Sequence, residues 1–581
     1  MSSTGNISPP LSSEVISSAW LSALISDLSS PSFSLKTAFT DDSYWRDLLA
    51  FTPDIRTLHT IPTMEQFLST PVSVAQPTGF QLLSGVRRTT TFIQGIIQFQ
   101  TVIAQCTGVF TLTQCEDSSW KALSFVTMME RFPGEIDRFG ARLGRSPLLC
   151  PPVEWNTAME FTAVVVGAGQ CGLSVAARLE NLGISTLVVE RLSSIGNVWR
   201  SRYKSLETNT PRAYNHLPFF PFPETSHEYV PSTDVADHLE NYQRALGLHV
   251  LTSAHISAVS YDSLAGTWTI SVSCSGRPSI TVTARHLIVA TGVGTLGGAT
   301  PVIPSIPGKR SFLGSILHSS QYKSPCIGRK VAVVGGGCSA HDIAQDLTNK
   351  GSRTVLIQRS PTAVVSRETI SRMLSVYVGQ DKLPTEIADR FYVALPLSKA
   401  LRASKHDVDR GADIDRDLKE DLSRHGYLLP DAEDSFLHRL VVRRAGYYID
   451  RGCAKLITTG KITVKSGHEI SHFSPTGLVF DDGSRVEADL VIFATGYSRT
   501  TIKHVAESLF GPKVADVVRD VGGWDSDCEP AGVWRPSGHK ALWFAEGDLF
   551  AARFYSQFLA LQIKAREMEL LSPDQRSYVP K

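Results

Sequence analysis

The stretch from Phe161 to Glu190 reads FTAVVVGAGQCGLSVAARLENLGISTLVVE and decides the fold of this chain. Its valine run, 164–166, is β-branched and predicts a strand buried on both faces. The glycines that follow have G-x-G-x-x-G spacing, and apolar residues then recur at helical intervals. The stretch therefore predicts a strand, a tight turn and a helix, with a second strand over 186–189. The three glycines are Gly167, Gly169 and Gly172.

Each glycine of this turn has its own task. Gly167 makes the tight turn, Gly169 lets a pyrophosphate approach the backbone, and Gly172 lets the helix pack closely on the strand. Glu190 ends the second strand, 190 − 167 = 23 residues after the first glycine, where a carboxylate accepts hydrogen bonds from a ribose. A plain strand-to-helix turn can show the same glycines, but the strand, helix and acid together favour a dinucleotide site. They leave open whether the nucleotide is NAD or FAD.

Length and composition limit the classes of protein to consider. At 581 residues, the chain is long enough for two to four domains. Its 42% hydrophobic and 19% charged residues are typical of a globular protein. The 57 basic residues nearly balance the 56 acidic ones, so the net charge of +1 favours neither nucleic acid nor a membrane surface as a partner. We therefore expect a small-molecule ligand.

The cysteines and the N-terminus indicate a compartment. The nine cysteines are scattered, with no C-x-x-C pair and no His/Cys cluster at metal-ligand spacing, so we expect no metal and a reducing environment. The N-terminus lacks the basic and apolar regions of a signal peptide. No apolar run reaches the roughly 18 residues of a membrane helix. These features predict a cytoplasmic protein.

The N-terminal part predicts a separate α+β unit over 13–133. Residues 1 to about 12 are rich in serine and proline and predict disorder. We expect a helix from Ser13, a second helix over 42–50, and then long antiparallel strands. This unit resembles the cone-shaped NTF2-like domain, for which a scaffold role is favoured over a pocket or a dimer contact. The expected strands cover 79–83, 91–105, 108–113 and 119–128, and residues 134–160 read as a linker.

A second nucleotide-binding pattern opens at residue 330 with KVAVVGGGCSAHDIAQDL. Gly335, Gly337 and Ala340 have G-x-G-x-x-A spacing, in which the alanine methyl still permits close packing. The following strand ends at Arg359, and 359 − 335 = 24. An arginine there can pair bidentately with a 2′-phosphate, so this site favours NADPH, whereas Glu190 favours a ribose diol. Two unlike dinucleotide sites imply that electrons pass from one to the other.

Five motifs from residue 161 to about 565 make the chain resemble the class B flavin-dependent monooxygenases, the flavin-containing monooxygenase family with its YUCCA relatives. Phe312, Gly314, His318 and Tyr322 fit the F-x-G-x-x-x-H-x-x-x-Y sequence of that family. Tyrosine at the last position resembles the N- or S-oxidising and YUCCA-like branch, and the resemblance implies a domain-positioning role for the histidine. The other motifs are G-x-x-W at 196–199, TNTP at 208–211, PFFPFP at 218–223, and the A-T-G turns at 290–292 and 494–496.

The resemblance implies a fold and a reaction. The fold is α/β, with two Rossmann-like domains for FAD and NADPH preceded by the NTF2-like unit. In the reaction, NADPH reduces FAD, the reduced flavin adds O₂ at its C4a carbon, and one oxygen atom passes from this peroxide to a small organic substrate. N-, S- and C-oxygenation all stay open, and secondary metabolism is the setting that we expect.

The resemblance also implies a division of the chain. We expect an FAD-binding domain over 161–304 that resumes over 488–566 with the C-terminal helix. The NADPH-binding domain then covers 305–487 and includes a helical insertion over about 368–450, which we expect to line or cover the substrate entrance. The oligomeric state stays open, a dimer included.

Asn209 is the residue that the resemblance assigns to the reaction, because it matches the family asparagine that reaches the flavin and NADP⁺. The alternative is a turn residue before Pro211. Matching positions add a further set of expected cofactor contacts. These are Arg191, Trp199, Arg200, Thr291, Gly292, Ser339, Thr495 and Gly496.

Two rival functions remain at this point. A flavin disulfide reductase shares the two-nucleotide architecture but needs a redox pair of cysteines, which the spacing does not offer. Cys171 and Cys338 stand in the two glycine turns, where packing requires only a small side chain. The other rival is a non-catalytic interaction protein that uses its NTF2-like domain, and the intact glycine motifs argue against it.

Overall fold

The computed structural model describes residues 11–30, 32–139, 158–274, 276–292, 300–323, 329–406, 414–431, 434–498, 506–507, 509–572 and 577–579. The disorder predicted for residues 1 to about 12 and most of the linker predicted over 134–160 lie outside these ranges. Among the described helices, none combines the length and the apolar character that crossing a membrane requires.

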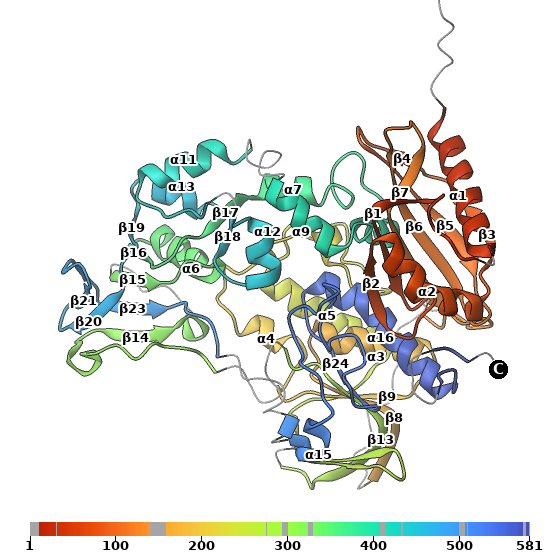
Figure 1. Cartoon of the computed structure of the whole chain (residues 1–581). Helices are drawn as coiled ribbons and strands as arrows, with labels where there is room; N and C mark the ends of the chain where they lie inside the picture. The colour runs from red at the N-terminus through yellow and green to blue at the C-terminus, as the bar shows by residue number, and fades with distance from the viewer. Residues whose placement is uncertain are drawn as a thin grey trace, which may run out of the picture.

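The N-terminal unit, red to orange in Figure 1, is a seven-stranded sheet with two helices, α1 (Ser13–Ser29) and α2 (Ile61–Ala75). The strand order is β2-β1-β7-β6-β5-β3, with β4 paired to β5. β1 runs parallel to β7, and the other pairs are antiparallel. The strands are β1 (Phe39–Leu48), β2 (Ile55–His59), β3 (Thr78–Leu82), β4 (Arg87–Arg88), β5 (Phe92–Gln100), β6 (Gln105–Gln114) and β7 (Trp120–Arg131).

The helix predicted over 42–50 is wrong, because these residues belong largely to β1. β1 lies between β2 and β7, and its last six residues are all buried. A strand covered on both faces has a continuous apolar run, which helical periodicity can imitate. The strand ends where the Asp47 carboxylate accepts backbone N–H bonds from Ala50, Phe51 and Thr52, and burial raises the pKa of Asp47 to about 6. The strand predicted over 91–105 is divided, since a turn separates β5 from β6.

The first α/β unit, at the lower centre of Figure 1, has the strand order β10-β9-β8-β13-β12-β11, with β24 beside β13. β8, β9, β10, β13 and β24 run parallel, and β11 and β12 form an antiparallel arm. Helices α3 (Gln170–Asn181) and α16 (Leu549–Glu567) contribute to one buried core against this sheet. The strands are β8 (Ala158–Val166), β9 (Thr186–Val189), β10 (His249–Leu251), β11 (Ala254–Asp262), β12 (Thr267–Cys274), β13 (Ile280–Val289) and β24 (Leu542–Phe544).

The second α/β unit, on the left of Figure 1, has five parallel strands in the order β14-β23-β15-β16-β19. Helices α6 (Cys338–Asn349) and α13 (Cys453–Thr458) pack with it. The predicted domain boundary at 488 lies before β23, but β23 pairs with β14 and β15 and so belongs to the sheet of the second unit. In the sheets, the boundary therefore follows β23. The strands are β14 (Ser315–His318), β15 (Lys330–Val334), β16 (Arg353–Gln358), β19 (Ile462–Ser466) and β23 (Leu490–Phe493).

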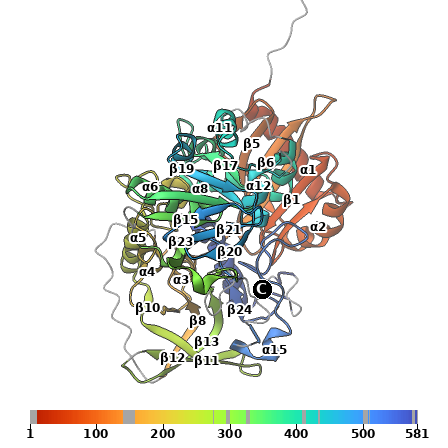
Figure 2. The ribbon, with the colours of Figure 1, turned by 90° about the vertical axis from the view of Figure 1, so that its left-hand side faces the viewer.

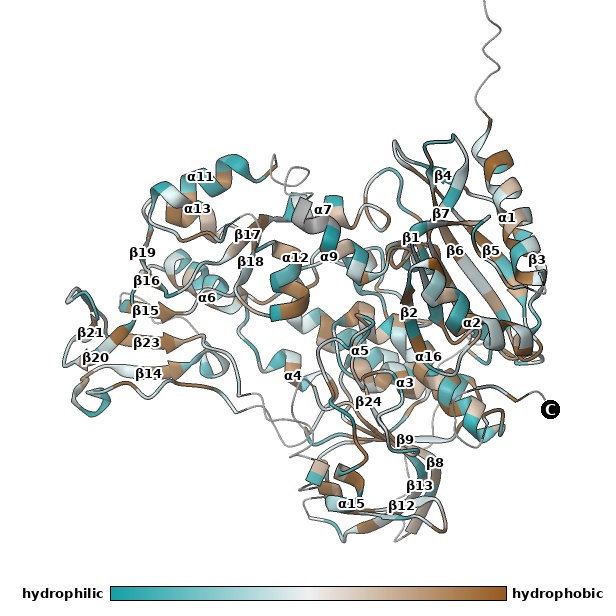
Figure 3. Cartoon of the chain, viewed as in Figure 1, coloured by the Kyte–Doolittle hydropathy of each residue, from teal (hydrophilic) through white to brown (hydrophobic). Residues whose placement is uncertain are grey.

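The segment between β17 (Ala363–Ser366) and β18 (Tyr447–Asp450) is largely helical and lies between the second α/β unit and the N-terminal sheet (Figure 1). Its surface helix α11 is mostly hydrophilic, whereas β15 and β23 are hydrophobic (Figure 3). The view turned by 90° shows β11 and β12 at the lower end and α1 and α2 along the right-hand side (Figure 2). The helices are α7 (Arg367–Met373), α8 (Thr385–Tyr392), α9 (Leu397–His406), α11 (Arg416–Arg424) and α12 (Phe436–His438).

The N-terminal unit is fixed to the rest of the chain by a shared core and by buried ion pairs. Its sheet residues form one apolar cluster with residues of α7, α8 and α16. Arg46 donates to both oxygens of Glu529, at 2.6 and 2.7 Å, and all but a few per cent of both side chains are buried. Arg535 contacts Asp54 in the same bidentate way, at 2.9 and 3.1 Å. Since the partners are paired and hydrogen-bonded, these contacts hold the two parts in one orientation.

Candidate functional site

The first phosphate turn joins β8 to α3, and its glycines meet three different constraints. Gly167 has φ +105°, and a Cβ there would lie 2.7 Å from the carbonyl oxygen of Ala290. A Cβ on Gly172 would lie 1.9 Å from the carbonyl oxygen of Gly167, so the close packing requires glycine. Gly169, the N-cap of α3, has no atom within 4 Å of the Cβ position and makes no side-chain cap bond. This open space at unpaired helix N–H groups fits a pyrophosphate.

Glu190 holds its carboxylate beside this turn. One oxygen accepts the backbone N–H of Ala168 at 2.7 Å, and the other accepts that of Leu192 at 2.7 Å. The backbone N–H of Glu190 is bonded to Leu251 in the neighbouring strand. Each carboxylate oxygen keeps a second lone pair, so the group can still accept a ribose hydroxyl.

Three predicted cofactor contacts follow Glu190 in the sequence, and each has a different environment. Arg200 is engaged with α5 (Ser232–Leu246), since it donates to Asp237 at 2.6 Å and to Glu240 at 2.8 Å. Trp199 is partly buried against the core of the first α/β unit, and Arg191 is exposed. Cofactor contact by these three residues stays a prediction, and the structure gives Arg200 the additional task of fixing the loop on α5.

Asn209 has an amide that the protein leaves unused. Its Oδ1 is buried and has no hydrogen-bond partner among the residues that the structure describes. The turn around it is made by other side chains: the Thr208 hydroxyl donates to the carbonyl of Thr210, and the Asn215 amide donates to the carbonyls of Thr210 and Pro211. Buried amides normally have partners. The unpaired Oδ1 therefore favours a ligand contact for Asn209 over the role of a turn residue.

The loop before Asn209 is tied to the second α/β unit. The Tyr203 hydroxyl donates to Asp342 of α6 at 2.8 Å. Arg451 lies 3.1 Å from the same carboxylate and donates to the carbonyl of Ser205 at 2.8 Å. A residue on this loop is therefore held between the two nucleotide units.

The second phosphate turn repeats the geometry of the first. Gly335 has φ +144°, and a Cβ on it would lie 2.6 Å from the carbonyl oxygen of Ala494. Gly337 is the N-cap of α6 and, like Gly169, has nothing within 4 Å of the Cβ position. Ala340 is fully buried, and Ser339 is partly buried beside it. This turn also fits a pyrophosphate.

Arg359 comes directly after β16, at the edge of the second turn. Its guanidinium lies 3.6 Å from the carboxylate of Glu469, and both side chains are 71% exposed. An exposed pair of this kind contributes roughly 0 to 1 kcal/mol, so the arginine is free to turn to a stronger anionic partner.

The A-T-G turns lie where the chain passes between the units. Gly292 and Gly496 both have left-handed backbone, with φ +96° and +76°. His318 accepts the Ser320 N–H through Nδ1, so its Nε2 carries the proton and donates to the carbonyl of Gly496 at 2.9 Å. Burial lowers the pKa of His318, which keeps the ring neutral. The Thr495 hydroxyl donates to the carbonyl of Val302, and Thr291 precedes residues outside the described ranges.

Sequence reasoning missed the approach of α16 to the first turn. The Gln170 amide donates to the carbonyl of Gly547 at 3.1 Å, and the Cys171 thiol lies 3.5 Å from the same oxygen. Asp548 caps α16 by accepting the Ala551 N–H at 2.8 Å, and burial raises the pKa of Asp548. The N-termini of α3 and α16 therefore meet. The aspartate signals a helix start, but nothing in the sequence shows which helix lies beside it.

The cysteines of the two turns are not suited to redox exchange. Burial raises the pKa of Cys338 to about 12 and raises that of Cys171 still further. Thiols that stay protonated are poor nucleophiles. Among the described cysteines all are free.

One group outside the turns has metal-ligand chemistry. His468, Asp481 and Asp482 place ligand atoms within 4.8 Å of one another on the hairpin after β19. The Lys465 ammonium lies 2.6 Å from Asp482 and already supplies a positive charge. We assign no metal to it.

Comparison with known proteins gives one family and a set of relatives. The FMO-like family, described as flavin-binding monooxygenase-like, matches residues 161–514. Indole-3-pyruvate monooxygenase YUCCA1 of Oryza sativa subsp. japonica is 30% identical over 340 residues, which cover 58% of this chain and 76% of that protein. Probable indole-3-pyruvate monooxygenase YUCCA8 of Arabidopsis thaliana is 28% identical and covers 62% and 81%.

Solved structures share the fold. The crystal structure of OTEMO in complex with FAD and NADP has a TM-score of 0.50 and 17% identity, over 70% of this chain and 86% of that chain. At this identity, the likeness concerns the arrangement of the two α/β units.

Proposed function

Because the chain belongs to the flavin-binding monooxygenase-like family, we propose that it uses FAD, NADPH and O₂ to place one oxygen atom on a small organic substrate. The observation that carries this proposal is the pair of phosphate turns. Each has an N-cap glycine that faces open space, and the strands that follow end at residues of opposite charge. Glu190 suits a ribose diol, and Arg359 suits a 2′-phosphate.

Each cofactor has a set of residues that would hold it. Bound FAD and NADPH supply the hydride and oxygen chemistry. Gly169, with the N-termini of α3 and α16, would hold the FAD diphosphate, and Glu190 would hold its ribose. Gly337, with the N-terminus of α6, would hold the NADPH diphosphate. We assign the remaining turn residues to the same two sites as predicted above.

Asn209 is the residue that we place at the reacting end of both cofactors. Its loop is bonded to α6 of the second unit and precedes the ordered stretch 211–223 of the first. A preorganised amide in a site shielded from water can stabilise developing charge without rearranging. As predicted above, we propose that the insertion over about 368–450 covers the substrate entrance and excludes water there.

The substrate class follows less directly from the site. The relatives reported above are named for a 2-oxo acid, indole-3-pyruvate, so C-oxygenation of such an acid stands beside N- and S-oxygenation. Tyr322 does not decide between them, because it is buried in the second unit and donates to Asp346 at 2.6 Å. Tyr322, which the resemblance links to a branch of the family, therefore packs in the core of the second unit.

Oxygen labelling tests the function. The purified protein should be yellow, oxidise NADPH in the presence of O₂, and transfer one ¹⁸O atom from ¹⁸O₂ to product, across amine, thioether, indole and 2-oxo-acid candidates. Mass spectrometry of the products reads the result. NADPH oxidation with disulfide reduction and no label would instead support the reductase, and a protein that binds no flavin would support the interaction protein.

Arg359→Ala should weaken the preference for NADPH over NADH. The loss of one charged hydrogen-bonding partner amounts to roughly 1.5 to 3 kcal/mol, or about ten-fold to a hundred-fold in kcat/KM for NADPH. The rate with NADH should stay nearly unchanged, since NADH has no 2′-phosphate. An intact preference in the variant would show that another residue reads the phosphate.

Glu469→Gln is the matched control for this site. It removes the exposed carboxylate 3.6 Å from Arg359, which competes with the phosphate. The variant should therefore bind NADPH somewhat more tightly, by at most about five-fold, given that such pairs contribute roughly 0 to 1 kcal/mol.

We propose that residues 13–133 form an NTF2-like domain that acts as a scaffold. Support comes from its helices and seven-stranded sheet, and from the apolar core that it shares with α16. The remaining division is proposed as predicted above, with the return to the FAD-binding domain placed after β23.

A further inference from the structure

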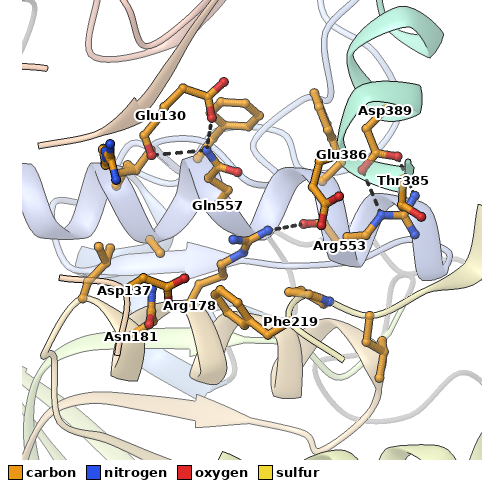
Figure 4. A pocket seen from close by; sticks show the side chains of 18 of the residues that line it. Glu130, Asp137, Arg178, Asn181, Phe219, Thr385, Glu386, Asp389, Arg553 and Gln557 are labelled. Atoms are coloured by element: carbon orange, nitrogen blue, oxygen red, sulfur yellow. Dashed lines mark hydrogen bonds and ion pairs between the residues drawn. The ribbon is translucent and has the colours of Figure 1, made fainter. Parts of the chain in front are cut away.

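A cavity of about 530 Å³ lies between the N-terminal unit and the first α/β unit (Figure 4). Its walls come from β7, the segment 135–137, α8, the loop 216–221, the C-terminal end of α3 and the middle of α16. Arg178 of this cavity stands 178 − 170 = 8 residues after the first residue of α3, or about 12 Å along the helix from the phosphate turn. The volume is in the range of small-molecule sites, and the position separates it from both dinucleotide turns.

The guanidinium of Arg178 lies at the centre of this cavity and is poorly satisfied (Figure 4). Among the described residues, it donates one long hydrogen bond, 3.4 Å to the carbonyl oxygen of Arg553. Its Nε is buried and has no hydrogen-bond partner within the described ranges. In the described part of the chain, no carboxylate oxygen lies within 4.0 Å of it. Burial lowers the pKa of Arg178, as expected for a cation that lacks a counter-ion.

The other arginines that line the cavity have hydrogen-bond partners in the protein. Arg553 makes a bidentate pair with Asp389, at 2.6 and 2.9 Å, and Arg390 donates to Glu130 at 2.8 Å. Both of these carboxylates are therefore engaged. Three more acidic residues line the cavity, Glu135, Asp137 and Glu386, and in the described part of the chain none of them forms an ion pair with Arg178. Arg131 is exposed to water and bonded to Gln105. Arg178 is thus the partly buried arginine of this cavity without an acidic partner among the described residues, an arrangement that an anionic ligand would stabilise.

The side chains around Arg178 indicate the chemical character of the rest of the ligand. The Cζ atom of Arg178 lies 4.6 Å from the centroid of the Phe219 ring, within cation–π distance. Phe220, Phe554, Phe558 and Leu561 add apolar surface, and the Gln557 amide is already engaged with Glu130. We propose that this cavity is a second ligand site, for a small carboxylic acid whose carboxylate pairs with Arg178 and whose apolar body packs on the phenylalanines. A planar guanidinium matches a carboxylate in a bidentate pair.

Three probes that differ only in their head group test the proposal on the full FAD-loaded chain. They are 4-phenylbutyrate, its neutral amide 4-phenylbutanamide and the cation 4-phenylbutylamine, each measured by isothermal titration calorimetry. The acid should bind about ten-fold to a hundred-fold more tightly than the amide, the ratio expected for hydrogen bonds between charged groups. The amine should bind most weakly. Equal affinity for acid and amide, or no binding by any of the three, would overturn the proposal.

Two arginine variants locate the site. Arg178→Met should lower the affinity for the acid to that of the amide, while Arg131→Met, on the exposed rim of the same cavity, should leave it unchanged. Both variants should keep their FAD, which is read from the visible spectrum. An Arg178→Met protein that binds the acid like wild type would place the acid elsewhere. If that variant fails to fold, the ratio of acid to amide in wild type still decides.

Discussion

A Gly169→Val variant should purify as a folded but colourless protein. Gly169 has extended backbone and nothing within 4 Å of its Cβ position, so the protein itself can accept the side chain. The valine occupies the space where the diphosphate must lie, and it separates the phosphates from the α3 N–H groups. Two lost hydrogen bonds to a charged group, at roughly 1.5 to 3 kcal/mol each, weaken FAD binding about 10²- to 10⁴-fold. Flavin absorbance and titration with FAD measure the effect.

Gly337→Val is the matched control, because Gly337 has the same open geometry at the second turn. This variant should stay yellow and lose affinity for NADPH by a similar factor, while dithionite still reduces its flavin. Thermal unfolding of both apoproteins should match wild type. A yellow Gly169→Val protein would move the FAD site elsewhere, and two colourless variants would show that valine damages the fold rather than a cofactor site.

Asn209→Ala should separate NADPH oxidation from product formation. The variant should bind FAD and be reduced by NADPH, because neither step requires the Asn209 amide, whose buried Oδ1 has no partner in the described part of the chain. Oxygenated product should fall about 10²- to 10³-fold, the usual effect of removing one preorganised donor, equivalent to roughly 2.7 to 4 kcal/mol. Hydrogen peroxide should rise correspondingly. Product and peroxide, each measured per NADPH consumed, give the coupling.

Two further variants distinguish the amide's role from that of its turn. Asn209→Asp keeps an acceptor oxygen but loses the N–H donors, so it should uncouple like alanine. Asn215→Ala removes three bonds within the turn, two to the carbonyls of Thr210 and Pro211 and one from the Thr210 hydroxyl, and should instead lower the free energy of unfolding by roughly 1 to 3 kcal/mol. Unchanged coupling in both Asn209 variants would make that residue a turn residue. Loss of FAD from them would make it structural.

The strand, turn and helix of both nucleotide units were predictable because they depend on local chemistry. A β-branched run, three glycines and an acid at the end of the next strand lie within 30 residues of one another, and β8, α3 and β9 confirm that reading. The helix predicted over 42–50 was wrong because the structure of this segment depends on residues that are distant in the sequence. The apolar residues of β1 are set by β2 and β7 on its two sides, which a local window does not contain.

The sequence by itself determined the two phosphate turns, the acid and the arginine that end the following strands, and hence the pair of unlike nucleotide sites, because glycine geometry and hydrophobic period act over a few residues. Only the tertiary structure decided the contacts between distant segments. Arg46 meets Glu529 across 483 residues, the α16 N-terminus meets α3 across 376, and Asn209 Oδ1 and Arg178 Nε are left without hydrogen-bond partners among the described residues. Whether a polar group is paired or free depends on every element packed around it, and that packing is a property of the whole fold.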